Sequence, residues 1–280
     1  MRLIETVKEM QQICRDLRTT TSSLGFVPTM GALHAGHMSL VQRARSECSV
    51  VAASIFVNPL QFAPTEDLAK YPRTFTEDSH QLEAAGVDIL FAPTAAEMYP
   101  SGSLTTITVS GLSDRLDGAS RPGHFTGVAT VVAKLLHIVA PHRSYFGQKD
   151  AVQLAVLRQM VHDLNFDVDL ISCPIIRDPD GLALSSRNRY LTPTERHHAL
   201  VLQRTLQHIE QRIAFGTRDT ATLLREGTQL LQAEPGVRTD YLAIVDPNTL
   251  TPLDQAHPGA LIAVAAWVGN TRLIDNLIAS

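Results

Sequence analysis

The sequence predicts an α/β protein with a doubly wound, Rossmann-like parallel sheet, followed by a smaller α+β domain. Up to about residue 176, short apolar runs alternate with amphipathic runs at helical spacing, which is the pattern of a sheet wound with helices. The run 50–57 is continuous and rich in β-branched residues, as in parallel strands buried on both faces. A change of pattern after Ile176 places the boundary there, giving domains 1–176 and 177–280.

The first domain is expected to begin with a helix, because Met1–Glu5 lead into apolar residues spaced three to four apart over 7–17. Further helices are expected from His34 onward and over 76–85, 126–139 and 151–164, and strands over 25–29, 50–57, 89–92, 144–146 and 168–171. The alternating stretch 105–109 is expected to be an outer strand. Ligands of such sheets bind beyond the carboxyl ends of the strands.

The second domain is expected to open with a turn at 177–181. Thr192, Pro193 and Glu195 form a capping box with proline at the first helical position, so a long helix should run to about Phe215. A helix over 220–232 and strands over 241–245 and 260–267 should follow.

Composition limits the class of protein. The chain has 280 residues, 44% of them hydrophobic, and no apolar run approaches the ~20 residues of a membrane helix. The N-terminus lacks the apolar core of a signal peptide. Three cysteines without pairing logic predict a reducing, cytoplasmic setting. A net charge of −4 argues against a nucleic-acid-binding surface, and no membrane partner is expected.

The most informative motif is His34-Ala35-Gly36-His37, which follows a predicted strand and the turn 29–31 and opens an amphipathic helix. A helix N-terminus offers unpaired N–H groups and partial positive charge, which suit phosphate. Gly36 leaves room for a nucleotide against the backbone. The two histidines are three residues apart and can share a helix face. Besides binding a nucleotide, they could serve as metal ligands or as structural residues.

Polar groups follow two other predicted strands. Asn58 and Gln61 come after 50–57, and Gln61 can read a hydroxyl or carboxylate, or cap local backbone. Gly147, Gln148, Lys149 and Asp150 form another strand-to-helix turn, with Gln153 one helical turn further on. Lys149 is a candidate phosphate ligand, and a solvated Lys–Asp pair is the alternative.

Two more segments offer anion-binding groups. Ser185, Ser186 and Arg187 lie on a loop after the expected boundary and are suited to close over a triphosphate. Arg121 is a further candidate, although a lone loop arginine is more often a surface ion-pair residue.

Several motifs together resemble the pantothenate synthetase (pantoate–β-alanine ligase) family over nearly the whole chain. They are residues 28–37, 54–62, 71–73, 121–125, 146–150, 180–188, 265–269 and 272–275. His-x-Gly-His alone would indicate only the wider nucleotidylyltransferase superfamily, whose fold type the chain should share. Many members of the family have Glu where this chain has Gln148 and Met where it has Leu184.

The resemblance implies ligation of (R)-pantoate and β-alanine to pantothenate with ATP, through pantoyl adenylate, releasing pyrophosphate and AMP. It implies Mg²⁺ bridging phosphates, with protein ligands left unassigned, and a homodimer. The implied catalytic residues are His34, His37, Lys149, Ser185 and Arg187. The implied ATP site comprises Met30, Gly31, Ala32, Leu33, His34, Ala35, Gly36, His37, Gly147, Gln148, Lys149, Asp150, Ile176, Leu184, Ser185, Ser186 and Arg187, and the acid substrate would meet Gln61, Gln153, Asn58 and Arg121.

Two other functions stay open at this point. One is a nucleotidylyltransferase that leaves AMP on its product, and the other is a nucleotide-binding regulator without turnover. The pair Gln61 and Gln153 favours a small hydroxy-acid acceptor over both. An aminoacyl-tRNA synthetase is disfavoured, because no basic tRNA-binding extension is visible.

Overall fold

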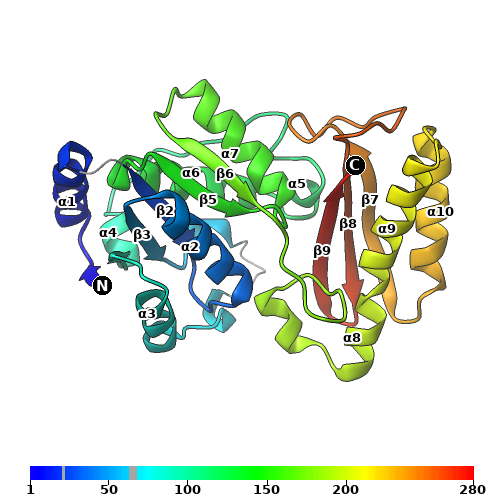
Figure 1. Ribbon diagram of the computed structural model, residues 1–280, viewed down its shortest axis with the longest axis horizontal. Helices are drawn as coiled ribbons and strands as arrows, with labels where there is room; N and C mark the ends of the chain where they lie inside the picture. The colour runs from blue at the N-terminus through cyan, green and yellow to red at the C-terminus, as the bar shows by residue number, and fades with distance from the viewer. Residues whose placement is uncertain (21–22, 63–67) are drawn as a thin grey trace.

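Two β-sheets organise the chain (Figure 1). The computed structural model describes residues 1–20, 23–62 and 68–280. Up to the end of the first sheet the elements are β1 (Arg2–Ile4), α1 (Val7–Thr20), β2 (Leu24–Thr29), α2 (Ala35–Glu47), β3 (Val50–Ile55), the 3-10 helices η1 (Pro59–Gln61) and η2 (Leu68–Lys70), α3 (Phe75–Ala84), β4 (Ile89–Phe91), α4 (Ala95–Met98), α5 (Asp117–Ser120), α6 (His124–Val139), β5 (Arg143–Gly147), α7 (Ala151–Asp163) and β6 (Asp169–Cys173). The remaining elements are η3 (Ser186–Tyr190), α8 (Pro193–Ala199), α9 (Val201–Ala214), α10 (Thr220–Ala233), β7 (Val237–Val245), β8 (Leu261–Val268) and β9 (Thr271–Ile278).

The first sheet has six parallel strands in the order β1-β4-β3-β2-β5-β6. The chain winds outward in one direction from β2 to β3 and β4, then crosses back to add β5 and β6 on the other side of β2. The winding therefore reverses between β2 and β5, and sheets of this kind bind ligands at such a switch point. The predicted doubly wound parallel sheet is confirmed.

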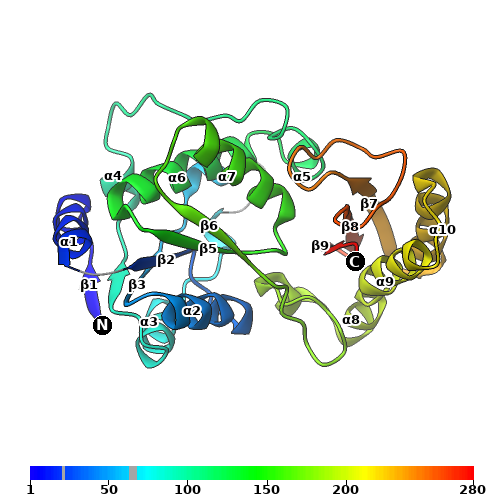
Figure 2. The same ribbon diagram turned by 45° about the horizontal axis from the view of Figure 1, so that its top comes forward.

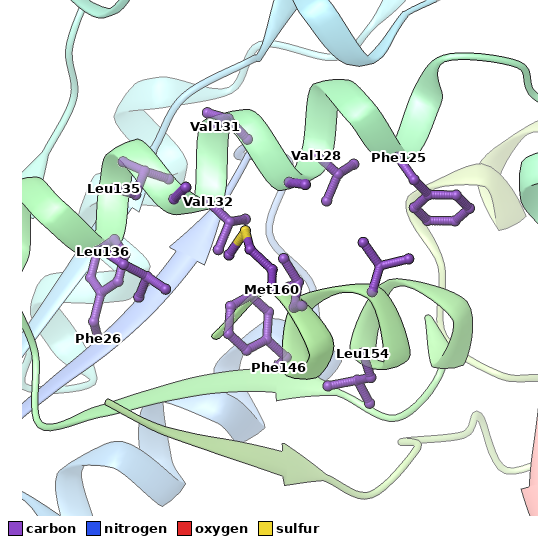
Figure 3. Close-up of a cluster of buried hydrophobic side chains, with 14 of the residues drawn as sticks. Phe26, Phe125, Val128, Val131, Val132, Leu135, Leu136, Phe146, Leu154 and Met160 are labelled. Atoms are coloured by element: carbon purple, nitrogen blue, oxygen red, sulfur yellow. The ribbon is translucent and has the colours of Figure 1, made fainter. Parts of the chain in front are cut away.

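Helices cover both faces of this sheet. Figure 2 shows α2 and α3 on one face and α6 and α7 on the other. α6 is the most apolar helix, and its buried side chains pack against α7 and β5 (Figure 3). Coverage of both faces explains why the four central residues of β3 are all buried rather than alternately buried and exposed.

The second sheet is small and antiparallel, in the order β7-β8-β9. α9 and α10 cover its face away from the first sheet (Figure 1) and form a separate apolar cluster with it. Leu261 and Ala263 of β8, however, belong to the large cluster around α6. The smaller α+β part is thus present, while its division from the rest at residues 176 and 177 stays a prediction.

Four expectations about elements were wrong or incomplete. Met1–Glu5 do not start a helix: residues 2–4 form β1, because Arg2 N–H donates to Asp88 O (2.8 Å) and extends the sheet beside β4. The stretch 105–109 lies outside the sheets, since Ile107 N–H is taken by the Thr130 hydroxyl (2.9 Å) on α6. The helix expected to end near Phe215 is interrupted at Leu200, and β9 was not anticipated.

Candidate active site

A cavity of about 1410 Å³ lies beyond the carboxyl ends of β2 and β5, where the winding of the large sheet reverses. Its opposite wall comes from the β8–β9 turn. Fourteen residues expected at the site line it: Met30, His34, Gly36, His37, Arg121, Gly147, Lys149, Asp150, Gln153, Ile176, Leu184, Ser185, Ser186 and Arg187. Seven others lie outside this lining: Gly31, Ala32, Leu33, Ala35, Asn58, Gln61 and Gln148.

The turn after β2 is held by a carboxylate from α3. Asp78 is 1% exposed and accepts hydrogen bonds from the N–H groups of Ala32 (2.9 Å) and Leu33 (2.8 Å). Gly31 (φ +80°) and Ala32 (φ +51°) are both left-handed, and a Cβ on Gly31 would lie 2.9 Å from Asp78 Oδ2. This strained turn delivers the chain to the start of α2.

His34 caps α2 and at the same time faces the cavity. Its Nδ1 accepts from Gly36 N–H (3.1 Å), so the proton of the neutral ring is on Nε2. A Cβ on Gly36 would lie 2.9 Å from the same ring, which explains the glycine. His34 therefore presents a donor, rather than an acceptor, to a ligand in the cavity.

The second histidine of the motif lies against the first. The ring centroids of His34 and His37 are 4.1 Å apart, and Nδ1 of His37 is buried without a hydrogen-bond partner among the described residues. Burial, and then the neighbouring His34, lower the pKa of His37 to about 3, and burial also lowers the pKa of His34. Both rings are therefore uncharged near neutrality, and each neutral ring has one N–H that can donate a hydrogen bond.

Asn58 and Gln61 are packed behind the cavity. Asn58 caps η1, accepts from the Tyr99 hydroxyl (2.8 Å) and donates to Gly127 O (3.0 Å) and Gln61 Oε1 (3.1 Å). These protein contacts favour a supporting role for Asn58. Nε2 of Gln61 donates to Met30 Sδ (2.8 Å), and Met30 lines the cavity in front of it.

The β5–α7 turn (residues 148–150) carries Lys149 to the cavity wall. Gln148 points away from the cavity: its Oε1 accepts from Ser172 Oγ (2.9 Å) and its Nε2 donates to Asn276 Oδ1 (3.2 Å). The Lys149 ammonium has no hydrogen-bond or ion-pair partner among the described residues. Gln153 lines the cavity from the first turn of α7.

The segment after β6 folds back as a short hairpin that ends in η3. Leu184 N–H donates to Ile176 O (2.9 Å), and Asn188 Nδ2 donates to Ala183 O (3.0 Å). Ser185 caps η3 by accepting from Arg187 N–H (3.2 Å). The hairpin thus places Leu184 beside Gly36 and aims residues 185–187 along the cavity.

The wall from the small sheet contains residues for which the sequence predicted no role. Arg272 donates to Asp117 Oδ1 (2.7 Å) and, through two nitrogens, to Asp240 Oδ2 (2.9 and 2.7 Å). Ser120 Oγ also donates to Asp240 (2.8 Å). The pairing outweighs burial and raises the pKa of Arg272. Asp117 and Asp240 lie far from Arg272 in the sequence, so no local sequence pattern indicates that they pair with it.

Two aromatic residues close another side of the cavity. The rings of Phe62 and Tyr71 are 5.9 Å apart, edge to face, and burial raises the pKa of Tyr71 to about 12. Tyr71 belongs to one of the motifs named above, but its sequence context alone indicates no function.

Metal-binding groups are sparse. No three His, Cys, Asp or Glu side chains gather as a metal site within residues 1–20, 23–62 and 68–280. The cavity does contain the exposed carboxylate of Asp150. This donor set fits a hard cation that arrives with phosphate groups and borrows one carboxylate, rather than a resident ion in a protein cage.

Comparison with known proteins identifies a family that covers nearly the whole chain. Residues 2–278 match the family model described as pantoate-beta-alanine ligase. The chain is 58% identical over 278 residues to the pantothenate synthetase of Koribacter versatilis, covering 99% of this chain and 96% of that protein. The corresponding protein of Thermotoga petrophila is 52% identical over 278 residues, with 99% of each chain covered.

Solved structures agree. A pantothenate synthetase from Thermus thermophilus superposes with a TM-score of 0.92 at 50% identity, covering 100% of this chain and 99% of the other. A pantoate-beta-alanine ligase from Francisella tularensis, solved in complex with beta-gamma ATP and β-alanine, gives a TM-score of 0.78 at 36% identity, covering 100% and 98%.

Proposed function

The chain belongs to the pantoate-beta-alanine ligase family, and on that premise we propose that it joins (R)-pantoate to β-alanine with ATP, through pantoyl adenylate. The observation that carries this proposal is one cavity lined by two neutral histidines, Lys149, the Ser185–Arg187 loop and the amide of Gln153. Homologues of that name over the full length, and the Francisella complex with beta-gamma ATP and β-alanine, support it.

The first step activates the acid. An oxygen of the pantoate carboxylate attacks the α-phosphorus of ATP, and the bond to the bridging oxygen breaks with its electron pair, so pyrophosphate leaves. His34 and His37 donate hydrogen bonds to phosphate oxygens from the N-terminus of α2, where the helix field also favours negative charge. Because both rings are neutral, they need no change of protonation at physiological pH.

Positive groups complete the environment of the transferring phosphorus. Lys149 from the β5–α7 turn and Arg187 from η3 stabilise charge that develops on the phosphate oxygens. Ser185 and Ser186 donate hydroxyl hydrogen bonds as the loop closes, and Ile176, Leu184 and Asp150 border the nucleoside. Mg²⁺ would supply further charge neutralisation when ATP brings it, and the exposed carboxylate of Asp150 would be available to hold it.

The second step forms the amide. The uncharged amine of β-alanine attacks the acyl carbon, its nitrogen loses a proton to solvent, the carbonyl re-forms, and AMP leaves with the electrons of the mixed-anhydride bond. Gln153 and Gln61 hold pantoate by its hydroxyl and carboxylate oxygens, Gln61 after Met30 has moved. Arg121, which contacts His124 Nε2 (2.9 Å) and lines the cavity, would also border the acid. Neutral amides give recognition without adding a competing charge.

Assembly and location are further parts of the proposal. We infer a homodimer from the family resemblance and a cytoplasmic location from three cysteines that are buried and unpaired. Within the described part of the chain, no helix is both long and apolar enough to cross a membrane. Sedimentation analysis of the purified protein tests the dimer, and a fluorescent fusion tests the location.

Pyrophosphate–ATP exchange tests the function. With pantoate, ATP and Mg²⁺ but no amine, labelled pyrophosphate should enter ATP, and AMP should accumulate only after β-alanine is added. Exchange that requires β-alanine would rule out a stepwise adenylate. A product that retains AMP after amine addition would identify a simple nucleotidylyltransferase, and binding without exchange would identify a regulator.

A further inference from the structure

We propose that Asn276, in the last strand of the small sheet, is a positioning residue for Lys149. It fixes the backbone of the β5–α7 turn from across the molecule, and so sets where the ammonium lies. The inference rests on the proposed function, in which Lys149 contacts the phosphates of ATP.

The Asn276 side chain is 3% exposed and uses both ends of its amide on this turn. Nδ2 donates to Gln148 O and to Lys149 O, each at 2.9 Å. Oδ1 accepts from Gln148 Nε2 at 3.2 Å. One side chain thus holds two consecutive carbonyls and the side chain of Gln148.

These two carbonyls need an outside partner. β5 ends at Gly147 and α7 begins at Ala151, so the carbonyls of Gln148 and Lys149 lie between the two elements. A buried carbonyl without a partner is costly, and a single amide nitrogen carries two donors. Asparagine is therefore chemically suited to the position, whereas an aspartate there would face two carbonyl oxygens with a carboxylate.

The strand that carries Asn276 is itself anchored to the other side of the cavity. Asp275 is 4% exposed and accepts from both terminal nitrogens of Arg177 (2.7 and 2.9 Å) and from Asn276 N–H (2.8 Å). Arg177 also donates to Gly181 O (3.1 Å) within the hairpin that leads to Ser185. Two adjacent residues of β9 therefore hold both segments: Asn276 holds the turn that bears Lys149, and Asp275 holds the hairpin through Arg177.

This arrangement predicts a defect in the chemical step. Without the Asn276 contacts the turn gains freedom, and the ammonium spreads over several positions. A displacement of about 1 Å of a charge-stabilising group can cost about 10²-fold in rate. ATP binding in the ground state should change much less, because many other groups contact the nucleotide.

The test compares Asn276→Ala and the isosteric Asn276→Asp with a matched control, Thr220→Val. Thr220 is also buried in the same part of the chain and also gives two bonds to backbone carbonyls, Leu253 O (2.6 Å) and Asp254 O (3.0 Å), away from the cavity. Pantoate-dependent pyrophosphate–ATP exchange is measured per folded molecule, alongside the KM for ATP and thermal unfolding. Lys149→Ala and Lys149→Ala/Asn276→Ala complete a double-mutant cycle.

Both Asn276 variants should slow exchange by about 10²-fold with little change in the KM for ATP, while Thr220→Val exchanges like the wild type. The double variant should be no slower than Lys149→Ala, since Asn276 acts through that lysine. Wild-type exchange rates in the Asn276 variants, multiplicative losses in the double variant, an equal loss in Thr220→Val, or failure of both Asn276 variants to fold would each overturn the positioning role. Absence of exchange in the wild type would instead overturn the proposed function.

Discussion

At the scale of single residues, the site depends on two histidines that stay uncharged. His34 uses Nδ1 on its own helix and keeps the Nε2 hydrogen for a ligand. His37 is buried beside it with Nδ1 unpartnered among the described residues. A buried polar atom without a partner is expensive in a folded protein, and a ligand oxygen or an ordered water would satisfy it.

Replacing His37 should therefore affect chemistry more than folding. His37→Ala should slow pantoyl-adenylate formation by about 10²–10³-fold in single-turnover measurements, the usual effect of removing one donor to a developing charge. Aminolysis of supplied pantoyl adenylate should suffer less, because the α-phosphorus has already reacted. Near-normal adenylation in a folded variant would contradict the catalytic role, and stoichiometric zinc lost on mutation would point to a metal site.

The same residue makes stability depend on pH. Burial lowers the pKa of His37 from 6.5 to about 3, so between these values the unfolded chain binds a proton that the folded chain does not. The free energy of unfolding should thus fall as pH decreases from about 6.5 toward 3. The free energy of unfolding can be measured by urea titration at several pH values in this range. Plotted against pH, it should change less steeply for His37→Gln than for the wild type, whereas the control His80→Gln, at an exposed histidine, should follow the wild type. Equal slopes for all three proteins would refute this assignment.

At the scale of elements, a glycine sets how closely η1 packs on α6. A Cβ on Gly127 would lie 2.2 Å from Leu60 O and 2.7 Å from Gln61 Cα. Alanine is the better helix former by about 1 kcal/mol, so a glycine inside α6 is explained by this close approach. The contact places Gln61 behind Met30, and Gln61 O also meets His124 Nδ1 (2.7 Å).

Gly127→Ala should consequently push η1 outward and raise the KM for pantoate several-fold, while the KM for ATP stays close to wild type. Gly227→Ala is the control for a tightly packed helical glycine away from the cavity, because its Cβ would lie 2.7 Å from Leu242 Cδ2, the end of a side chain, in α10. Both variants should lower the unfolding temperature. If steady-state kinetics show that both variants raise the KM for pantoate equally, η1 is not the element that positions Gln61.

At the scale of the whole molecule, ion pairs join the small sheet to the helical layer of the large one. Arg272 of β9 reaches Asp117 of α5 as well as Asp240 of β7, and all three side chains are largely buried. The Tyr241 hydroxyl donates to the same Asp117 (3.1 Å). Removing one partner of a buried ion pair is strongly destabilising, because it leaves the other charge buried without compensation.

Arg272→Ala should leave two carboxylates without their cation and lower the free energy of unfolding by about 3–5 kcal/mol. Arg2→Ala, which breaks the exposed pair with Glu9, should change it by less than about 1 kcal/mol. Urea denaturation of both variants measures the difference. A loss below about 1 kcal/mol for Arg272→Ala would mean that packing alone joins the two sheets.

The sequence predicted the parallel sheet from local patterns, and it predicted 14 residues of the cavity lining from local motifs and from the family resemblance. Helical spacing, β-branched runs and glycine-containing turns are short-range features. β1 was not predicted, because three residues are too few to show a periodic pattern. The alternating stretch 105–109 was wrongly predicted as a strand, because it contacts α6 instead of pairing with another strand. The roles of three other residues were not predicted, because each hydrogen-bonds to residues far away in the chain. They are Asp78, Asn276 and Arg272.

The hydrogen bond between Asn276 and Lys149 O spans 127 positions in the chain, and this separation has a consequence for folding. Contacts so distant in sequence close late, since loop entropy must be overcome before they form. We therefore expect the contact of β9 with the β5–α7 turn to form after the large sheet has gathered its strands. On gradual denaturation, enzymatic turnover should accordingly disappear before the helical circular dichroism signal does.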